Sequence, residues 1–357
     1  MLINPIVSIQ SKRLYKGPEH EGIFLCHNCY TTTLSQPNMY SIIQLALLLI
    51  TLAHSAPTPD HLPTNLHHRS SLPGYGTLAT TTNGSIVRAV INNPPLNLWD
   101  YKLASDISSF VDNLATNTNN TTTPNPKVVI FSSANPDFFI AHYDIHALSA
   151  ASPVLPPGNS TLIGEQLLRT VTNLATLPVI FIAEINGRAS AAGNEFAVQC
   201  DIRYAGPGAK LSQLEIGFGL IPGAGGVQFL VKLIGRARAL EYILSGRAVD
   251  AVTAAAIGWV NKAFGSVGEL VRETDALAER IAAFPEGGLA GVKARVNVQK
   301  PGEDDLRGDN ELFTRLAGTR VTEEAEALYF ELSGNEVAGT FELDLPEDLT
   351  EIVPPAA

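Results

Sequence analysis

Two glutamates stand in sequence surroundings that favour opposite roles in proton transfer. Glu195 follows the small residues 190–194, where an apolar strand is expected to pass into a helix. The first N–H groups of a helix have no partner inside it, so this helix start suits an oxyanion, and its dipole favours an ionised Glu195 that activates water. Glu215 lies between Leu214 and Ile216, an apolar setting that raises the pKa of a carboxyl and lets it keep a proton. The two form a candidate acid/base pair; the alternative is that Glu195 only begins a helix.

A third segment, residues 138–145, follows an expected strand and contains His142 and Tyr143. His142 is a candidate for a part in catalysis, with a plain hydrogen-bonding or packing role as the alternative. His142 and His146 are the only histidines after residue 68, and structural zinc normally takes four ligands, so no metal site is expected. The chain lacks a Gly-x-Ser-x-Gly elbow, a His-Glu-x-x-His pair and a P-loop, which argues against serine-hydrolase, zincin and P-loop chemistry.

The elements that would position these residues alternate between strands and helices. Strands are expected over residues 78–81, 86–91, 128–131 and 179–183, the first two joined by a hairpin turn at Asn83-Gly84. Helices are expected over residues 101–115, 162–174, 226–233, 237–244, 251–257, 270–284, 289–296 and 303–331. The glycines at 223–226 begin like a dinucleotide-binding fingerprint, but Gln228 takes its last place, so they indicate a tight turn instead. This alternation predicts an α/β architecture.

Composition narrows the classes of partner. The chain has 357 residues, 45% of them hydrophobic, which is enough for a large folded core. Its net charge of −11 is concentrated in residues 303–351, which contain fifteen acidic and three basic residues, whereas residues 57–302 contain eighteen of each sign. Without a basic excess nucleic acid is not an expected partner. The acidic stretch is interpreted as a solvated face, with a surface for a cationic partner as the alternative.

The N-terminal quarter has the pattern of a targeting segment. Residues 42–52 are apolar and uncharged, too short for a stable membrane span but typical of a signal-peptide core. This interpretation makes residues 1–38 an extension of the gene model, 39–56 a signal peptide starting at Met39, and 57–74 a linker. A membrane anchor or a buried helix is the alternative. Asn-x-Ser/Thr sequons fit a secreted glycoprotein and occur at Asn83, Asn119, Asn120 and Asn159.

Taken together and in this order, the three segments resemble the crotonase (enoyl-CoA hydratase/isomerase) superfamily. The resemblance runs from about Tyr75 to Asn297 and is continuous over residues 178–264. It includes residues 200–205, the Pro-Gly-Ala-Gly-Gly turn at 222–226 and the Leu-Ser-Gly run at 244–246. The resemblance implies a spiral of ββα turns over residues 75–300. It also implies that the acidic helical region and tail, residues 301–357, take part in a homotrimer or a hexamer.

The resemblance also implies an active site. In that family two backbone N–H groups hold a thioester carbonyl as an enolate, and by position these belong to Tyr143 and Ala192. Hydratases of the family use two glutamates, matched here by Glu195 and Glu215, with His142 and Gly193 as possible auxiliary residues. The implied reaction adds water to an α,β-unsaturated acyl-CoA; coenzyme A enters only as part of the substrate, and neither a cofactor nor a metal is expected.

The sequence departs from the family pattern at the oxyanion donors. His142 and Tyr143 replace a Gly and a small residue, and Ala191 and Ala192 replace a glycine pair. A positive φ at Ala192 would cost about 1–2 kcal/mol, and the Tyr143 side chain would narrow the acyl pocket or the route of the pantetheine.

Several alternatives stay open within this fold. Isomerisation or hydrolysis of an acyl-CoA would use the same oxyanion hole. A secreted crotonase-like protein without CoA activity fits the apparent signal peptide, because acyl-CoA is an intracellular metabolite. The expected location is accordingly the secretory pathway if translation starts at Met39, and otherwise the mitochondrion or peroxisome.

Overall fold

The computed structural model describes residues 74–116, 125–148, 159–334 and 339–355, which lie in one compact unit, residues 66–357. The expected gene-model extension, signal peptide and linker, and the sequons at Asn119 and Asn120, lie outside the described residues. Asn83 is exposed at the end of a strand, and Asn159 begins a helix.

Two sheets form the core. The larger has the order β1-β2-β3-β5-β7-β10, with only the β1–β2 pair antiparallel. Its strands are β1 (Leu78–Asn83), β2 (Ile86–Ile91), β3 (Val128–Ser133), β5 (Ile180–Ile185), β7 (Ile202–Ala205) and β10 (Lys262–Ala263). The smaller sheet has the order β4-β6-β8-β9, with β4, β6 and β8 parallel. Its strands are β4 (Phe138–Ile140), β6 (Arg188–Ser190), β8 (Lys210–Ser212) and β9 (Val249–Asp250).

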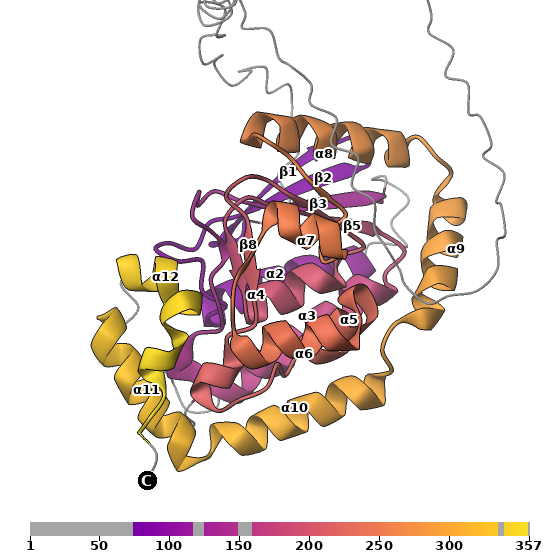
Figure 1. The fold of residues 1–357 in the computed structure, drawn as a ribbon. Coiled ribbons are helices and arrows are strands. Elements are labelled where there is room, and N and C mark those ends of the chain that lie inside the picture. The colour runs from indigo at the N-terminus through magenta and orange to yellow at the C-terminus, as the bar shows by residue number, and fades with distance from the viewer. Residues whose placement is uncertain (1–73, 117–124, 149–158, 335–338, 356–357) are drawn as a thin grey trace, which may run out of the picture. The chain divides into compact units, whose positions relative to one another are not determined.

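The helices follow the strands in a regular order. In the part of the chain that the structure describes, the first helices are α2 (Tyr101–Thr116), α3 (Asn159–Thr176), α4 (Ala192–Gln199), α5 (Gly226–Ile234), α6 (Arg236–Ser245), α7 (Ala251–Ile257) and α8 (Val267–Ala282). The C-terminal ones are α9 (Glu286–Val296), α10 (Glu303–Ala317), α11 (Arg320–Ser333) and α12 (Thr340–Asp348), with short 3-10 turns η2 (Ile145–Ala147), η3 (Glu215–Phe218), η4 (Asn297–Gln299) and η5 (Leu349–Ile352). The units β3-β4-α3, β5-β6-α4 and β7-β8-α5 each give one strand to the larger sheet and one to the smaller sheet. Figure 1 shows the helices α3, α4 and α5 of these units next to one another. This repetition confirms the ββα spiral that the resemblance implied.

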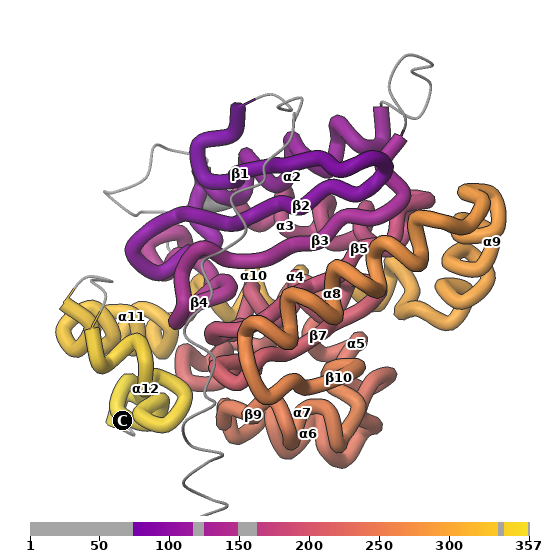
Figure 2. Tube along the Cα trace, turned by 90° about the horizontal axis from the view of Figure 1, so that it is seen from above, coloured from indigo at the N-terminus to yellow at the C-terminus, as the bar shows by residue number. Residues whose placement is uncertain are grey.

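The large sheet is buried on both faces, which explains the continuous apolar runs of its central strands. In β3, Val128 and Ile130 pack with Ala278 of α8 on one face. Val129 and Phe131 face the main core on the other side, with side chains of α2, α3 and α4. Figure 2 shows α8 lying across the strands of this sheet. Helix α8 therefore closes one face, and the inner helices close the other.

Two local expectations were wrong in detail. The first hairpin turns at Gly84-Ser85, because Asn83 still pairs with Ile86 and Gly84 takes the positive φ of 59°. The expected helix over residues 303–331 is two helices, α10 and α11, separated at Gly318-Thr319. Among the described residues, no helix combines the length and the apolar character needed to cross a membrane.

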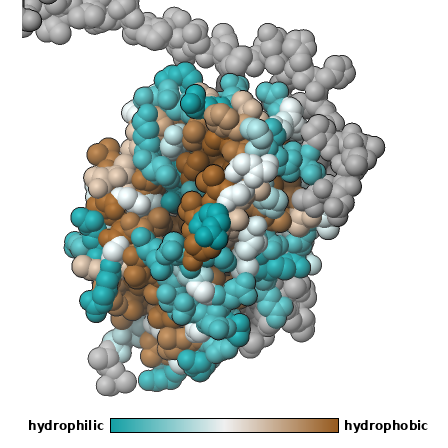
Figure 3. Space-filling model, turned by 90° about the vertical axis from the view of Figure 1, so that its right-hand side faces the viewer, coloured by the Kyte–Doolittle hydropathy of each residue, from teal (hydrophilic) through white to brown (hydrophobic). Residues whose placement is uncertain are grey.

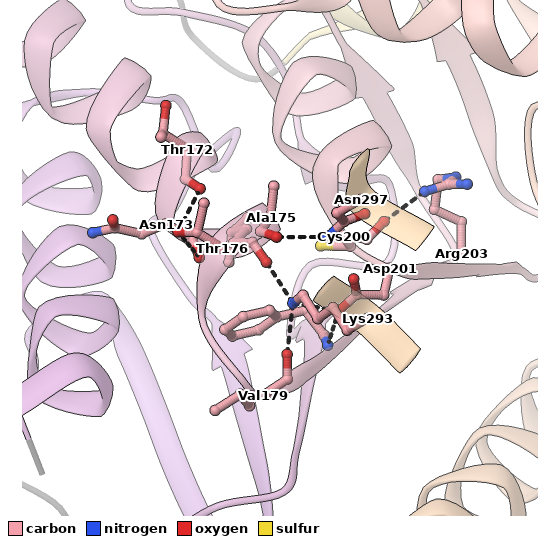
Figure 4. A network of polar contacts seen from close by, with 12 residues as sticks. Thr172, Asn173, Ala175, Thr176, Val179, Cys200, Asp201, Arg203, Lys293 and Asn297 are labelled. Atoms are coloured by element: carbon pink, nitrogen blue, oxygen red, sulfur yellow. Dashed lines mark hydrogen bonds and ion pairs between the residues drawn. The ribbon is translucent and has the colours of Figure 1, made fainter. Parts of the chain in front are cut away.

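A buried lysine fixes α9 to the core. The Lys293 ammonium donates to the carbonyl oxygens of Leu174 and Val179, at 2.6 and 2.7 Å, and to the Asp201 carboxylate at 2.7 Å (Figure 4). Burial lowers the pKa of Lys293 and raises the pKa of Asp201, and their ion pair opposes both shifts. Lys293 therefore ties α9 to the end of α3, the start of β5 and the start of β7.

Removing this ammonium is expected to destabilise the whole core. Lys293→Met keeps most of the apolar stem but leaves Asp201 and two buried carbonyls without their donor, so we expect a loss of about 3 kcal/mol in unfolding free energy. Lys232→Met, which changes an exposed lysine of α5, is the control and should change stability by less than about 0.5 kcal/mol. Chemical denaturation of both variants measures the difference. Equal denaturation midpoints for Lys293→Met and Lys232→Met would contradict this structural role of Lys293.

The side of the molecule on which α9 lies is partly apolar. Figure 3 shows hydrophobic surface there, interrupted by hydrophilic residues. Val292 and Val296 of α9 and Val298 of η4 are exposed, and a hollow of about 540 Å³ lies between α9 and the core. Apolar surface of this kind is a candidate for contact with another subunit.

Candidate active site

Three strand ends bring the predicted site residues together. The strands β4, β6 and β8 are neighbours in the smaller sheet and run parallel, so their carboxyl ends meet at one edge. His142 and Tyr143 follow β4, Ala192 and Glu195 follow β6, and Glu215 follows β8. Ligands of α/β proteins commonly bind at such an edge.

A small cavity lies at this edge, with a volume of about 60 Å³. It is lined by five predicted site residues, namely His142, Tyr143, Ala192, Glu195 and Glu215. The side chains of Leu214, Phe218 and Leu220 also line it and make its wall largely apolar. The structure therefore brings together residues that lie up to 73 positions apart in the sequence, from His142 to Glu215.

The predicted oxyanion donors belong to two different elements. Ala192 is the first residue of α4, so its N–H has no acceptor within that helix. Positive φ falls on Ala191, at 47°, and not on Ala192 as the sequence analysis considered. A non-glycine residue in this conformation carries about 1–3 kcal/mol of strain, and strain of this kind clusters where a backbone is held for function.

The second donor, Tyr143, is held against Trp99. The two residues form an isolated parallel bridge, in which the N–H of Trp99 donates to the His142 carbonyl at 2.8 Å. The Tyr143 ring lies against Phe313, with 6.5 Å between ring centroids, and lines the cavity. The bulky side chain therefore narrows the pocket, as expected from the sequence.

Gly193 has a packing role. A Cβ atom at this position would overlap the Ile140 carbonyl oxygen and lie 2.9 Å from the Ile140 Cβ. Helix α4 therefore touches the backbone of β4 at Gly193, and Gly193 is not among the residues that line the cavity. Because Gly193 has no side chain, α4 and β4 can approach each other, and these two elements lie next to the two predicted oxyanion donors.

Glu195 is fully buried and held by the glycine-rich turn before α5. Its Oε1 accepts the N–H groups of Ala224 and Gly226, at 2.7 and 2.9 Å. Burial raises the pKa of Glu195 to about 7, although these two hydrogen bonds favour the ionised form. The helix dipole alone predicted an ionised Glu195; burial outweighs that effect. A carboxyl with this pKa can gain and lose a proton near neutral pH.

Glu215 is the more strongly protonated of the two carboxyls. Burial, and then the negative charge of Glu195, raise its pKa well above the usual value, as the apolar neighbours predicted. The amide of Gln213 donates to its two oxygens, at 3.1 and 3.3 Å. Asn194 donates to Gln213 and accepts the Trp259 indole N–H at 2.9 Å, so a buried hydrogen-bond chain fixes the Glu215 carboxyl.

The C-terminal helices complete the site with residues that were not among the predicted site residues. Asn310 and Phe313 of α10 line the cavity, and Asn310 donates to the Gly223 carbonyl at 3.3 Å. The acidic residues of the 303–351 stretch therefore form a solvated face only on the outer side of these helices, because apolar residues at helical spacing point toward the core. The helical spacing of apolar residues around Phe313 was the feature of the sequence that could have predicted this contact.

His142 lines the same cavity, where its charge would oppose the raised pKa of Glu215. Its ring nitrogens lie 2.7 Å from the Tyr143 carbonyl and 3.1 Å from Glu342 of α12. Within the described residues, no group of three or more potential metal ligands surrounds it or any other residue.

Comparisons with known proteins identify the family. The enoyl-CoA hydratase/isomerase family model matches residues 81–334. A relative named probable mitochondrial enoyl-CoA hydratase from Dictyostelium discoideum is 34% identical over 169 residues, 47% of this chain and 61% of the relative. A putative enoyl-CoA hydratase/isomerase of Bacillus subtilis is 41% identical over 138 residues, 39% of this chain and 52% of the relative. The matches thus span just over half the length of these two curated relatives.

Solved structures agree with this match. A putative enoyl-CoA hydratase from Streptomyces avermitilis is 34% identical, covers 78% of this chain and 98% of its own, and superposes with a TM-score of 0.69. The family model covers more than half of the chain, and the ββα repeats and the structural neighbour agree with it. The chain belongs to the enoyl-CoA hydratase/isomerase family, as the resemblance of its three segments indicated.

Proposed function

We propose that this protein is an enzyme that adds water to an α,β-unsaturated acyl-CoA thioester. The observation that carries the proposal is the pair of buried carboxyls, Glu195 and Glu215, which line one cavity in unequal environments. Relatives named enoyl-CoA hydratase, from Dictyostelium discoideum and from Pongo abelii, support the same reaction. The acyl-CoA would be the substrate, and the proposed reaction requires no cofactor.

The proposed reaction divides proton transfer between the two carboxyls. Ionised Glu195 takes a proton from water as the water oxygen bonds to C3, and the π electrons of the C2=C3 bond move to form the enolate. The N–H groups of Tyr143 and Ala192 hold the enolate oxygen, and each such donor is worth about 3–4 kcal/mol in related sites. Glu215 then gives its proton to C2. Transfer of the proton from Glu195 to Glu215, directly or through solvent, restores the enzyme.

The unequal environments support this division of roles. The N–H groups of Ala224 and Gly226 stabilise the carboxylate form of Glu195 and thus suit it to act as the base. At Glu215, burial and the charge of Glu195 outweigh the hydrogen bonds that favour its ionised form, so it keeps its proton until the enolate forms.

A hydration assay tests the proposal directly. The purified protein is incubated with crotonyl-CoA and longer enoyl-CoA substrates, and loss of the conjugated double bond is followed by absorbance. Formation of 3-hydroxyacyl-CoA supports hydration. Migration of the double bond without addition of water would indicate an isomerase, and release of free CoA thiol would indicate a hydrolase. If no CoA thioester reacted or raised the melting temperature, the proposal would fail.

The proposed roles predict a bell-shaped dependence of kcat/KM on pH. Glu195 must be ionised, and burial raises its pKa to about 7, so kcat/KM should fall about tenfold per unit below that pH. Activity should fall again at higher pH, where Glu215 loses its proton. Because the two carboxyls interact, the apparent pKa values of the acid and alkaline limbs are properties of the pair and not of either residue alone. Rates with crotonyl-CoA across the pH range measure both limbs, and a flat acid side would contradict the assignment.

The location and assembly are separate proposals. Relatives from Dictyostelium discoideum and Rattus norvegicus are named mitochondrial, which supports an intracellular location over the secreted alternative. A homotrimer or a hexamer would cover the exposed apolar residues Val292, Val296 and Val298.

A further inference from the structure

A buried polar cluster links the C-terminal helices to one of the oxyanion donors. His142 Nε2 lies 3.1 Å from Glu342 Oε2 of α12 and 3.3 Å from the Tyr329 hydroxyl of α11. The Tyr329 hydroxyl donates to the other Glu342 oxygen at 2.7 Å. All three side chains are buried, and Phe218, Phe330 and Phe341 pack around the Tyr329 ring.

The acceptors in this cluster fix the protons on His142. Its Nδ1 lies 2.7 Å from the Tyr143 carbonyl oxygen, which can only accept, so Nδ1 carries a proton. Burial alone would raise the pKa of Glu342, but the hydrogen bonds from His142 and Tyr329 and the charge of His142 together lower it. An ionised Glu342 also only accepts, so the 3.1 Å contact fits a proton on Nε2 as well, and the geometry fits an imidazolium paired with a carboxylate.

The two peptide groups that flank Tyr143 are held by different partners, and the His142 ring is one of them. The peptide that contains the Tyr143 N–H is held by its own carbonyl, which accepts from Trp99 at 2.8 Å. The next peptide is held through the Tyr143 carbonyl, which accepts from His142 Nδ1. The backbone before and after the Tyr143 Cα is thus held by Trp99 and by the His142 ring, and the ring in turn contacts Glu342 and Tyr329.

Stability alone gives little reason for this cluster. A buried ion pair is seldom more stable than well-packed apolar side chains of similar size, because both ions lose their hydration. The arrangement instead places the His142 ring on the wall of the cavity that Glu195 and Glu215 also line.

We propose that His142, held by Glu342 and Tyr329, is a positioning residue that aims the Tyr143 N–H at the enolate oxygen and adds a fixed positive charge beside it. This inference rests on the proposed function and assigns part of the oxyanion hole to helices α11 and α12. The group that contacts the enolate oxygen is the Tyr143 N–H, and the cluster of His142, Glu342 and Tyr329 acts only by positioning it.

The test measures enolate stabilisation as well as turnover. Acetoacetyl-CoA is bound to each variant, and the ultraviolet absorbance of its enolate reports how strongly the oxyanion hole favours that form. Glu342→Gln keeps the shape of the side chain and removes its charge, so we expect about tenfold less enolate and an about tenfold lower kcat, with KM changed less than about threefold. Glu347→Gln, an exposed carboxyl of the same helix, should behave as wild type.

Two further variants separate positioning from charge. His142→Ala removes the donor to the Tyr143 carbonyl, and we expect an about 100-fold loss of kcat. His142→Asn places an amide N–H where Nδ1 was but cannot reach Glu342, so it should recover about tenfold of that loss. A purely structural role would lower the melting temperature of these variants and leave the enolate fraction of the folded protein unchanged.

The outcomes distinguish this inference from the function on which it rests. Reduced enolate absorbance in Glu342→Gln, with partial recovery in His142→Asn relative to His142→Ala, would support the inference. Wild-type absorbance in both Glu342→Gln and His142→Ala, or an equal loss in Glu347→Gln, would overturn it while hydratase activity stands. Failure of the wild-type protein to bind or hydrate any CoA thioester would overturn the proposed function, and this inference with it.

Discussion

Glu195→Gln is expected to lower kcat for crotonyl-CoA by about 10³-fold, and Glu215→Gln by a similar factor, because a positioned acid or base contributes about 10²–10⁴-fold. In Glu195→Gln the amide oxygen of the new side chain can still accept the N–H groups of Ala224 and Gly226, so the turn before α5 should keep its place. Neither variant buries a charge that the wild type lacks. The loss should therefore appear in kcat, with a melting temperature close to that of the wild type.

The two single variants and their combination measure how the carboxyls work together. If both serve one addition of water, the double variant should lose less than the product of the single losses, as for residues that act as a unit. Glu311→Gln, an exposed glutamate of α10, controls for the substitution itself. Wild-type turnover in both single variants would refute the assignment of acid and base.

Much of this site could be predicted because its parts lie close to strand ends in the sequence. Glu195 and Glu215 each follow a strand of the smaller sheet by a few residues, and parallel neighbours bring such positions to one edge. The apolar neighbours of Glu215 gave the correct direction of its pKa shift. Local chemistry therefore suggested the roles of the two carboxyls, and the resemblance to the family placed them in one site, because the strands of the smaller sheet that precede them were not predicted.

Long-range contacts were the part that the sequence did not show. The pKa of Glu195 depends on its burial, which only the assembled fold determines. The helix dipole alone predicted an ionised carboxyl and did not include the opposing effect of burial. The pairing of His142 with Glu342 joins residues 200 positions apart, and no local pattern indicates it. The turn residues Ala224 and Gly226 were recognised as a turn, but not as donors to Glu195.

Gly193→Ala is expected to damage both stability and catalysis. The new methyl group would overlap the Ile140 carbonyl oxygen, so α4 must move away from β4. Overpacking of this kind costs about 1–3 kcal/mol, and more where backbone atoms must shift. The same movement separates Ala192 on α4 from Tyr143 beyond β4, and a displacement of about 1 Å can cost about 100-fold in rate. We therefore expect at least that loss in kcat.

Gly291→Ala provides the matched control, because it adds the same methyl group to another helix. A Cβ at Gly291 of α9 would meet no atom within 4 Å, so this variant should gain up to about 1 kcal/mol from helix propensity and keep full activity. Melting temperatures and kcat of the two variants, measured together, separate packing from propensity. A Gly193→Ala protein with wild-type stability and rate would show that the contact between α4 and β4 does not set the distance between the oxyanion donors.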